Sequence, residues 1–276
     1  MKIAVAGLGL IGGSLAKAFL NIENTKVLGY DIDDSTIMRA RLEGALIEPL
    51  TEKNIKQCDY IFIALYPKAT LEFIEKFAEH ISEKTVVVDC GGIKRSICEK
   101  CFSIAKEHGF CFVGGHPMAG THNSGFKYSR ASMFDKASMI LVPSKNEKIE
   151  VLQSLKELLV KIGFKSVTIT SAQEHDRIIA YTSQLAHVVS NAYVKSPNAR
   201  VHKGFSAGSY RDLTRVAKLN PDMWTELFLE NGDNLVFEID TIINELQKYS
   251  DAIKNNNREE LYRLLDEGSK IKESIG

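Results

Sequence analysis

Three glycines near the N-terminus, Gly7, Gly9 and Gly12, constrain the fold of this chain more than any other feature. They follow an apolar run at residues 2–6 that has the character of a buried strand, and they precede a stretch with the apolar spacing of a helix. In such a unit the first glycine allows a tight turn, the second lets the backbone approach a pyrophosphate, and the third lets helix and strand pack closely. We therefore expect a dinucleotide-binding turn. Its cofactor-binding residues are Gly7, Leu8, Gly9, Leu10, Ile11 and Gly12, and the helix N-terminus receives the phosphates.

Asp31 strengthens this interpretation, because it closes a second strand-like run at residues 26–30. A carboxylate about 20 residues beyond the last glycine of such a turn accepts a hydrogen bond from a ribose 2′-hydroxyl. Asp33 and Asp34 lie nearby, and no arginine directly follows Asp31 to receive a 2′-phosphate. The pattern predicts NAD as the cofactor. The alternative is an ordinary strand-to-helix turn, since glycines punctuate turns generally.

The order of the remaining elements predicts two domains. Apolar runs with the character of strands recur, with helical patterns mostly between them, at residues 60–65, 85–88, 110–113, 139–142 and 166–170. This alternation predicts an α/β domain at residues 1–170, with a Rossmann-type, doubly wound and mainly parallel sheet. From Ser171 onward the apolar spacing is helical throughout, which predicts an all-helical domain at residues 171–276.

The helical half carries three start signals, and each precedes an amphipathic pattern. The signals are Ser171 with Glu174, Asn220 followed by Pro221, and Asn257 with Glu260. We interpret the second pattern as one helix that runs on through Leu246. About a hundred residues of amphipathic helix bury only a thin core, so we expect this half to pack on its own sheet domain and on a second copy, as a homodimer.

Charge and cysteine content limit the partners and the compartment. The 35 basic and 35 acidic residues cancel, so the chain has no global field that would attract nucleic acid or an anionic membrane. Five cysteines, all in the first half, do not suit a secreted disulfide framework, and we expect a cytoplasmic protein. The apolar stretch from Ile3 to Leu20 leaves a signal peptide as an alternative, which its glycines disfavour. Cys98 and Cys101 have the spacing of a buried helix face, and we expect no metal.

A second unusual segment, residues 114–122, directly follows the strand-like run at 110–113. Ligands of open α/β sheets bind at the carboxyl ends of strands. His116 stands there between a glycine pair and Pro117, which favours a fixed orientation, and imidazole is the natural base near neutral pH. The alternative is a structural, hydrogen-bonded histidine. His122 is recommended only by its proximity to His116.

A third segment, residues 209–215, places two arginines around Asp212 on a predicted helix. A guanidinium that faces the cleft between the domains can hold a carboxylate through two parallel hydrogen bonds, a geometry that lysine cannot match. The alternative is a solvated charged face.

These segments together resemble the prephenate dehydrogenase family over nearly the whole chain. The resemblance rests on the glycine turn through Ser14 and on three more specific blocks: Gly114-Gly-His-Pro-Met-Ala-Gly-Thr121, Asp212-Leu-Thr-Arg-Val-Ala217 and Asn220-Pro-Asp-Met-Trp224. It implies a Rossmann domain followed by a helical domain that forms an intertwined homodimer. It also implies an NAD(P)-dependent oxidation of the C4 carbinol of prephenate, with loss of the ring carboxylate as carbon dioxide, to give 4-hydroxyphenylpyruvate in tyrosine biosynthesis.

The resemblance also implies roles for single residues. His116 would accept the proton of the C4 hydroxyl, and Arg215 would hold the side-chain carboxylate of prephenate. Lys94 matches a common lysine of the family and would add positive potential, although it also fits an ordinary surface lysine. The other expected substrate-binding residues are His122, Gln184 and His187.

Three departures from the family pattern keep other substrates open. Many members have serine where Gly92 stands, an acidic residue at His122 and histidine at Gln184. Arogenate, with an amine in place of the ketone, is therefore a competing substrate. The further alternatives are another NAD-linked dehydrogenase of the β-hydroxyacid or pyrroline-carboxylate type, and a non-catalytic NAD-binding sensor.

Overall fold

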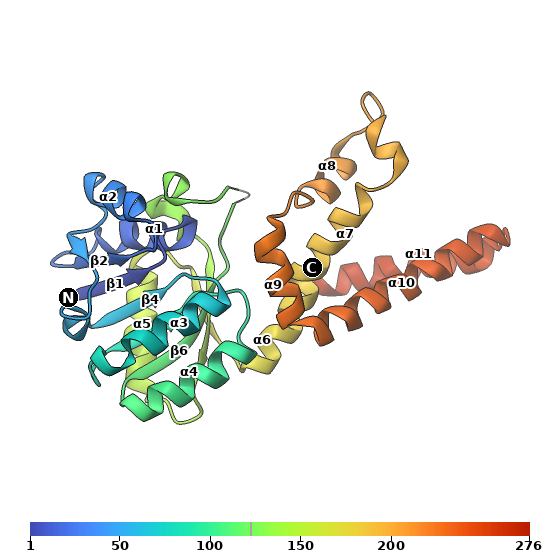
Figure 1. The fold of residues 1–276 in the computed structure, drawn as a ribbon. Coiled ribbons are helices and arrows are strands. Elements are labelled where there is room, and N and C mark those ends of the chain that lie inside the picture. The colour runs from blue at the N-terminus through green and yellow to red at the C-terminus, as the bar shows by residue number, and fades with distance from the viewer. Residues whose placement is uncertain (122) are drawn as a thin grey trace.

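The computed structural model describes residues 1–121 and 123–276, and its two parts are a sheet domain and a helical domain (Figure 1). Among the described residues one sheet has the strand order β3-β2-β1-β4-β5-β6-β7-β8. The strands are β1 Lys2–Ala6, β2 Lys26–Tyr30, β3 Glu48–Pro49, β4 Tyr60–Ile63, β5 Val86–Asp89, β6 Cys111–Pro117, β7 Ser138–Pro143 and β8 Ser166–Ile169. Neighbours pair in parallel except β6 with β7. The predicted fold class is confirmed, and β3 is a short strand that the sequence pattern did not reveal.

Helices cover both faces of this sheet. They are α1 Leu10–Phe19, α2 Asp34–Leu42, α3 Pro67–Phe77, α4 Arg95–His108 and α5 Ile149–Lys161. Side chains alternate along β1, so Ile3 and Val5 pack with α1 and α5, whereas Ala4 and Ala6 lie in the core that α3 and α4 cover. Burial of each large apolar side chain contributes about 1.5–3 kcal/mol. The two cores hold the parallel strands β1 to β6 with their carboxyl ends at a common edge.

Strand β6 is longer than the sequence predicts, which corrects the expected position of His116. Its first residues pair with β5 as far as Val113, and the strand then continues to Pro117 by pairing with antiparallel β7, where His116 lies opposite Ile140. A side chain at Gly115 would approach the carbonyl oxygen of Asp89 to 2.4 Å. The glycines therefore let β6 pass close to the end of β5, and His116 lies on a strand and not in a loop.

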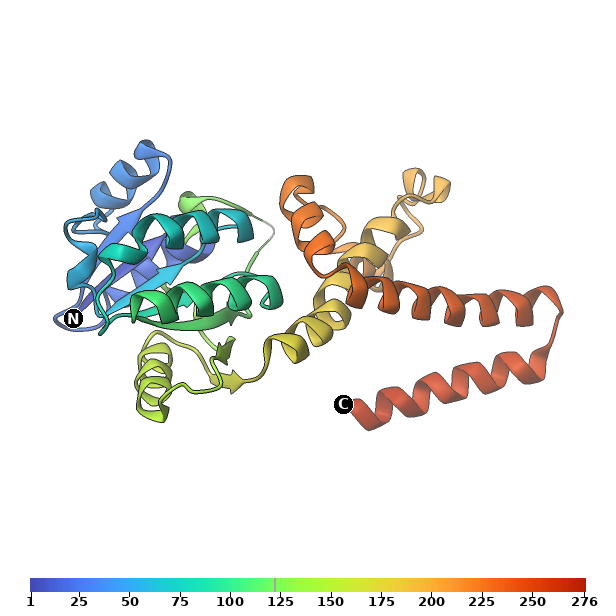
Figure 2. The same cartoon turned by 60° about the horizontal axis from the view of Figure 1, so that its bottom comes forward.

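The helical domain begins where the sheet ends. Its elements are α6 Ala172–Ile179, the π-helical turn η5 Ala180–Leu185, α7 Ala186–Tyr193, α8 Gly208–Thr214, α9 Pro221–Glu230, α10 Gly232–Lys254 and α11 Arg258–Ile275. Short 3₁₀ turns elsewhere are η1 Ile55–Gln57, η2 Ala78–His80, η3 Phe126–Tyr128, η4 Ala131–Phe134 and η6 Pro197–Arg200. Figure 2 shows α10 and α11 as an antiparallel hairpin that projects away from the sheet domain.

The predicted helix starts are confirmed, and one predicted helix is divided. Ser171, Asn220 and Asn257 each accept a hydrogen bond from a backbone amide of the following first turn. The expected continuous helix from Asn220 to Leu246 is wrong, because the chain leaves helical geometry at Asn231, between α9 and α10. The side chain of Asn231 is fully buried and hydrogen-bonded to α6 and η5, which favours the break.

Much apolar surface of the α10 and α11 hairpin remains exposed in the single chain. The exposed large side chains are Val236, Phe237, Ile243, Leu246, Ile253, Tyr262, Leu265, Ile271 and Ile275. So many exposed large apolar side chains on one hairpin are typical of an interaction surface. In the described part of the chain, no helix is both long enough and apolar enough to span a membrane.

Candidate active site

The glycine turn has the geometry that a bound dinucleotide requires. Gly7 has a φ of +82°, and a Cβ there would lie 2.4 Å from the carbonyl oxygen of Ala64 on the neighbouring strand connection. A Cβ on Gly12 would lie 1.8 Å from the carbonyl oxygen of Gly7, so only glycine lets α1 pack this closely. Gly9 has open space where its Cβ would be. A ligand can therefore approach the backbone at Gly9, while Gly7 and Gly12 shape the turn.

Two further features of the turn fit a dinucleotide. Gly9 is the N-cap of α1 and has no side chain to occupy the first amides of the helix, which leaves them available to an anion. Asp31 follows β2, and its Oδ2 accepts a hydrogen bond from the backbone amide of Leu8, at 2.8 Å. Its Oδ1 accepts from the amide of Asp33, at 3.0 Å. The carboxylate is thus held beside the turn, in the position expected for a ribose-binding group.

His116 is the first member of a chain of three side chains that crosses from the sheet to the helical domain. Its Nδ1 lies 2.9 Å from Nε2 of His175 on α6. Nδ1 of His175 lies 2.7 Å from Oδ1 of Asp176. His175 and Asp176 are almost completely buried, whereas His116 is partly exposed.

Hydrogen-bond chemistry determines the tautomers along this chain. The Asp176 carboxylate only accepts, so Nδ1–H of His175 must donate to it, and Nε2 of a neutral His175 then carries a lone pair. His116 must therefore donate its Nδ1–H to that lone pair. Nε2 of His116 is left unprotonated, and a neutral histidine in this tautomer can accept a proton.

The surroundings keep both imidazoles neutral. Burial, and then the neighbouring His175 ring and the Lys94 ammonium, lower the pKa of His116 well below its usual 6.5. Burial also lowers the pKa of His175, although the hydrogen bond to Asp176 opposes this shift. Burial acts to raise the pKa of Asp176, but hydrogen bonds from His175 and from the amides of Arg95 and Lys94 hold it below its usual range. The arrangement is therefore a carboxylate, an orienting histidine and a neutral base.

Lys94 lies behind this chain, in a buried ion pair. Its side chain is fully buried, and Nζ lies 2.5 Å from Oδ2 of Asp89 and donates to the carbonyl of Ile93. The two carboxylate oxygens of Asp89 also accept from the amides of Gly91 and Gly115. The expected surface or ligand-facing ammonium is thus paired inside the protein, where it fixes the turn after β5 against β6.

The other expected substrate-binding residues lie on the helical domain. His187 donates Nδ1–H to the carbonyl of Ser183, and its ring packs on Trp224 with centroids 4.1 Å apart. Gln184 is buried; its amide donates to the carbonyl of Leu227, and its Oε1 accepts from Asn231. Arg215 directly follows α8 and is exposed, and no carboxylate pairs with it among the described residues. His122 lies outside the described residues.

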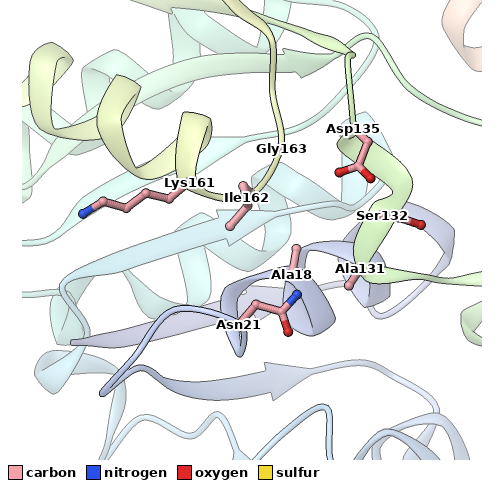
Figure 3. A pocket seen from close by; sticks show the side chains of 8 residues that line it. All are labelled: Ala18, Asn21, Ala131, Ser132, Asp135, Lys161, Ile162 and Gly163. Carbon is pink, nitrogen blue, oxygen red and sulfur yellow. The ribbon is translucent and has the colours of Figure 1, made fainter.

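A separate hollow of about 270 Å³ lies on the sheet domain, beside α1, η4 and the end of α5 (Figure 3). Its lining residues are Ala18, Asn21, Ala131, Ser132, Asp135, Lys161, Ile162 and Gly163. None of the expected site residues lines it. Among the described residues no group of histidine, cysteine and acidic side chains is arranged to hold a metal ion.

Sequence reasoning missed His175 and Asp176. They are the fourth and fifth residues of the helix that follows the Ser171 cap, where the apolar pattern gave them no weight. The adjacent histidine and aspartate were themselves a signal, because polar side chains that become buried in a helix require hydrogen-bond partners. The partner of His175, however, is His116, which lies 59 residues away in the chain.

Comparisons with known proteins find matches to both parts of the chain. A family model described as the nucleotide-binding domain of prephenate dehydrogenase matches residues 15–168, and one described as its dimerization domain matches residues 171–267. The prephenate dehydrogenase of Bacillus subtilis is 30% identical over 95% of this chain and 72% of its own length. A crystal structure of prephenate dehydrogenase from A. aeolicus, in complex with hydroxyphenyl propionate and NAD+, is 28% identical, with a TM-score of 0.86 over 100% of this chain and 98% of that one. Arogenate dehydrogenase of Synechocystis has a TM-score of 0.84 and 26% identity over the full length of both chains.

Proposed function

This chain belongs to the prephenate dehydrogenase family of NAD-linked oxidoreductases, and we propose that it catalyses the oxidative decarboxylation of prephenate to 4-hydroxyphenylpyruvate with NAD. The observation that carries the proposal is the chain His116, His175 and Asp176, which presents a neutral base at the sheet edge that also bears the glycine turn. Hydride transfer requires the dinucleotide and the substrate carbinol to lie side by side, and this edge can hold both.

The glycine turn and Asp31 are proposed to hold NAD. Bound there, NAD would supply the hydride acceptor. The open space at Gly9 and the first-turn amides at Leu10 and Ile11 suit its pyrophosphate, and Asp31 suits a ribose hydroxyl. Asp31, Asp33 and Asp34 would repel a 2′-phosphate, which supports NAD over NADP.

His116 is proposed as the proton acceptor. As hydride leaves C4, Nε2 of His116 takes the proton of the C4 hydroxyl, and electrons from the breaking bond to the ring carboxylate complete the aromatic ring. The resulting imidazolium is stabilised by its Nδ1–H bond to His175 and, through His175, by the Asp176 carboxylate. His175 and Asp176 are positioning residues in this scheme, because they act through His116.

Arg215 is proposed to bind the side-chain carboxylate of prephenate, because it is a cation without a protein carboxylate partner in the described part of the chain. His187 is proposed to contact the same ligand through Nε2, because its hydrogen bond to the carbonyl of Ser183 uses Nδ1. Lys94 and Gln184 are proposed to shape the site from inside the protein, since both side chains are buried and bonded. His122 completes the proposed set.

The two parts of the chain are proposed to divide the work. Residues 1–170 bind the cofactor and carry His116, and residues 171–276 supply Arg215 and form a homodimer. The exposed apolar side chains of α10 and α11 and the match of residues 171–267 to a dimerization domain support this assembly.

The test is a comparison of kcat/KM for prephenate and arogenate, each with NAD and with NADP. Prephenate with NAD should be the preferred pair. Preference for arogenate, which the likeness to the Synechocystis enzyme and the absence of a hydroxyl at Gly92 keep as a candidate, would replace the proposed substrate and leave the base in place. Binding of NAD without turnover of either compound would refute the proposed catalysis.

A further inference from the structure

The junction between the two domains is organised around Asp176. The N-terminus of α4 has no cap from its own sequence, because the side chain of the N-cap residue Lys94 makes no capping hydrogen bond. Instead, Asp176 of the helical domain accepts from the amide of Lys94 at 2.8 Å and from the amide of Arg95 at 2.9 Å. The same carboxylate orients His175. One side chain therefore caps a helix of the sheet domain and holds the support of the proposed base.

The guanidinium of Arg95 extends this junction to α10. It donates to both carboxylate oxygens of Asp233, with Nη1 2.7 Å from Oδ2, and to Oδ1 of Asn231 at 3.1 Å. Its Nε lies 3.4 Å from Oδ2 of Asp176. Asn231 in turn donates to the carbonyl of Asp176 at 2.8 Å. Figures 1 and 2 show the α6 end of the helical domain beside α4, where this junction lies.

We propose that Arg95 and Asp233 form an interdomain clamp that positions Asp176, and through it His175 and His116, for proton acceptance. Arg95 is a positioning residue with no contact to substrate in this scheme. The inference rests on the proposed role of His116. The bidentate hydrogen bonds from Arg95 also lower the pKa of Asp233 to about 2, so the clamp stays ionised throughout the working range.

The two halves of the clamp should move the pH profile in opposite directions. The charged and titratable groups around the base are Asp89 of β5, Lys94 and Arg95 at the start of α4, His116 of β6, and His175 and Asp176 of α6, with Asp233 of α10 against Arg95. A nearby cation disfavours protonation, so its removal raises the pKa of the neighbouring groups. The acid limb of the profile is the pH range in which kcat declines as the base becomes protonated. Arg95→Met should therefore move this limb to higher pH. Asp233→Asn removes an anion and should move that limb to lower pH.

The experiment measures kcat against pH for prephenate with NAD in the full-length chain, together with NAD affinity and Tm. Arg95→Met should lower kcat roughly tenfold, by loosening a hydrogen-bonded charge, with NAD affinity unchanged. Asp233→Asn, at a side chain that is 65% exposed, should fold normally and give a smaller loss. Arg95→Lys keeps the cation and should keep the acid limb. Arg263→Met is the matched control, because its guanidinium makes a bidentate pair with Glu260 on α11, outside the junction, and it should change neither kcat nor the limb.

Opposite shifts of the acid limb in the two variants, together with reduced kcat, would support the clamp. If Arg95 and Asp233 only stabilised the fold, their replacement would lower Tm and leave the acid limb in place. An unchanged profile in both variants, or shifts in the same direction, would overturn it. His116→Asn separates this outcome from failure of the proposed function. If that variant loses turnover while the clamp variants keep theirs, only the clamp is wrong; if it retains turnover, the base assignment itself is wrong.

Discussion

Replacing His175 with leucine isolates the support that the proposed base receives from the helical domain. The wild-type chain has a 2.9 Å hydrogen bond between Nδ1 of His116 and Nε2 of His175. In the transition state His116 becomes cationic, and a hydrogen bond to a charged group is worth about 1.5–3 kcal/mol. Because about 1.4 kcal/mol corresponds to a factor of ten, His175→Leu should lower kcat about 10- to 150-fold. It also removes the group that keeps Nε2 of His116 unprotonated.

The assay is steady-state NADH formation with prephenate, with NAD affinity measured by calorimetry and Tm by circular dichroism. NAD affinity should be unchanged, since the glycine turn lies on β1 and α1. His175→Gln keeps a side-chain acceptor and should recover part of the loss. His80→Leu, at a half-exposed histidine of the sheet domain, is the matched control and should have wild-type kcat. A wild-type kcat in His175→Leu, or a loss confined to KM, would refute the reasoning.

Four further outcomes test the remaining assignments. His116→Asn should lower kcat about 10²- to 10⁴-fold with NAD affinity preserved, and near-normal turnover would contradict the assignment. In the proposed scheme the neutral imidazole is the active form, and desolvation by the surrounding protein lowers the pKa of the partly exposed His116 well below 6.5, so kcat should still be at its plateau at pH 6.5 and decline only at lower pH; a decline that begins at or above pH 6.5 would count against the proposed base. Arg215→Ala should raise KM for prephenate about 10- to 150-fold, and an unchanged KM would mean that another cation holds the carboxylate. A side chain at Gly92 would meet only Leu227, at 3.6 Å, so Gly92→Ser should keep the wild-type Tm; if its hydroxyl donates to the C4 oxygen, as the serine of many family members is expected to do, kcat should rise, and a large fall in Tm would show that the space is not available.

Features that depend on neighbours in sequence were predictable. The roles of Gly7, Gly9 and Gly12 follow from one strand, one turn and one helix, and the structure shows the close contacts at Gly7 and Gly12 and the open side of Gly9. The caps at Ser171 and Asn257 are equally local, because each side chain bonds an amide three residues ahead.

Features that depend on distant segments were not predictable in the same way. The extension of β6 to His116 requires β7, and the break at Asn231 requires partners on α6 and η5. The pairing of His116 with His175 requires the two domains to meet. Periodicity records which face of an element is buried, but it carries no information about which polar groups meet there.

The position of His116 on β6 separates the chemistry of the site from its recognition of substrates. Pairing with β7 and the hydrogen bond from the Gly115 amide to the Asp89 side chain fix this part of β6, so His116 loses little conformational freedom when it engages a ligand. Residues 118–121 and helix α8 lie outside the sheet and are largely exposed. In a family with this arrangement, we expect changes in these segments to alter substrate preference while the proposed proton acceptor keeps its place.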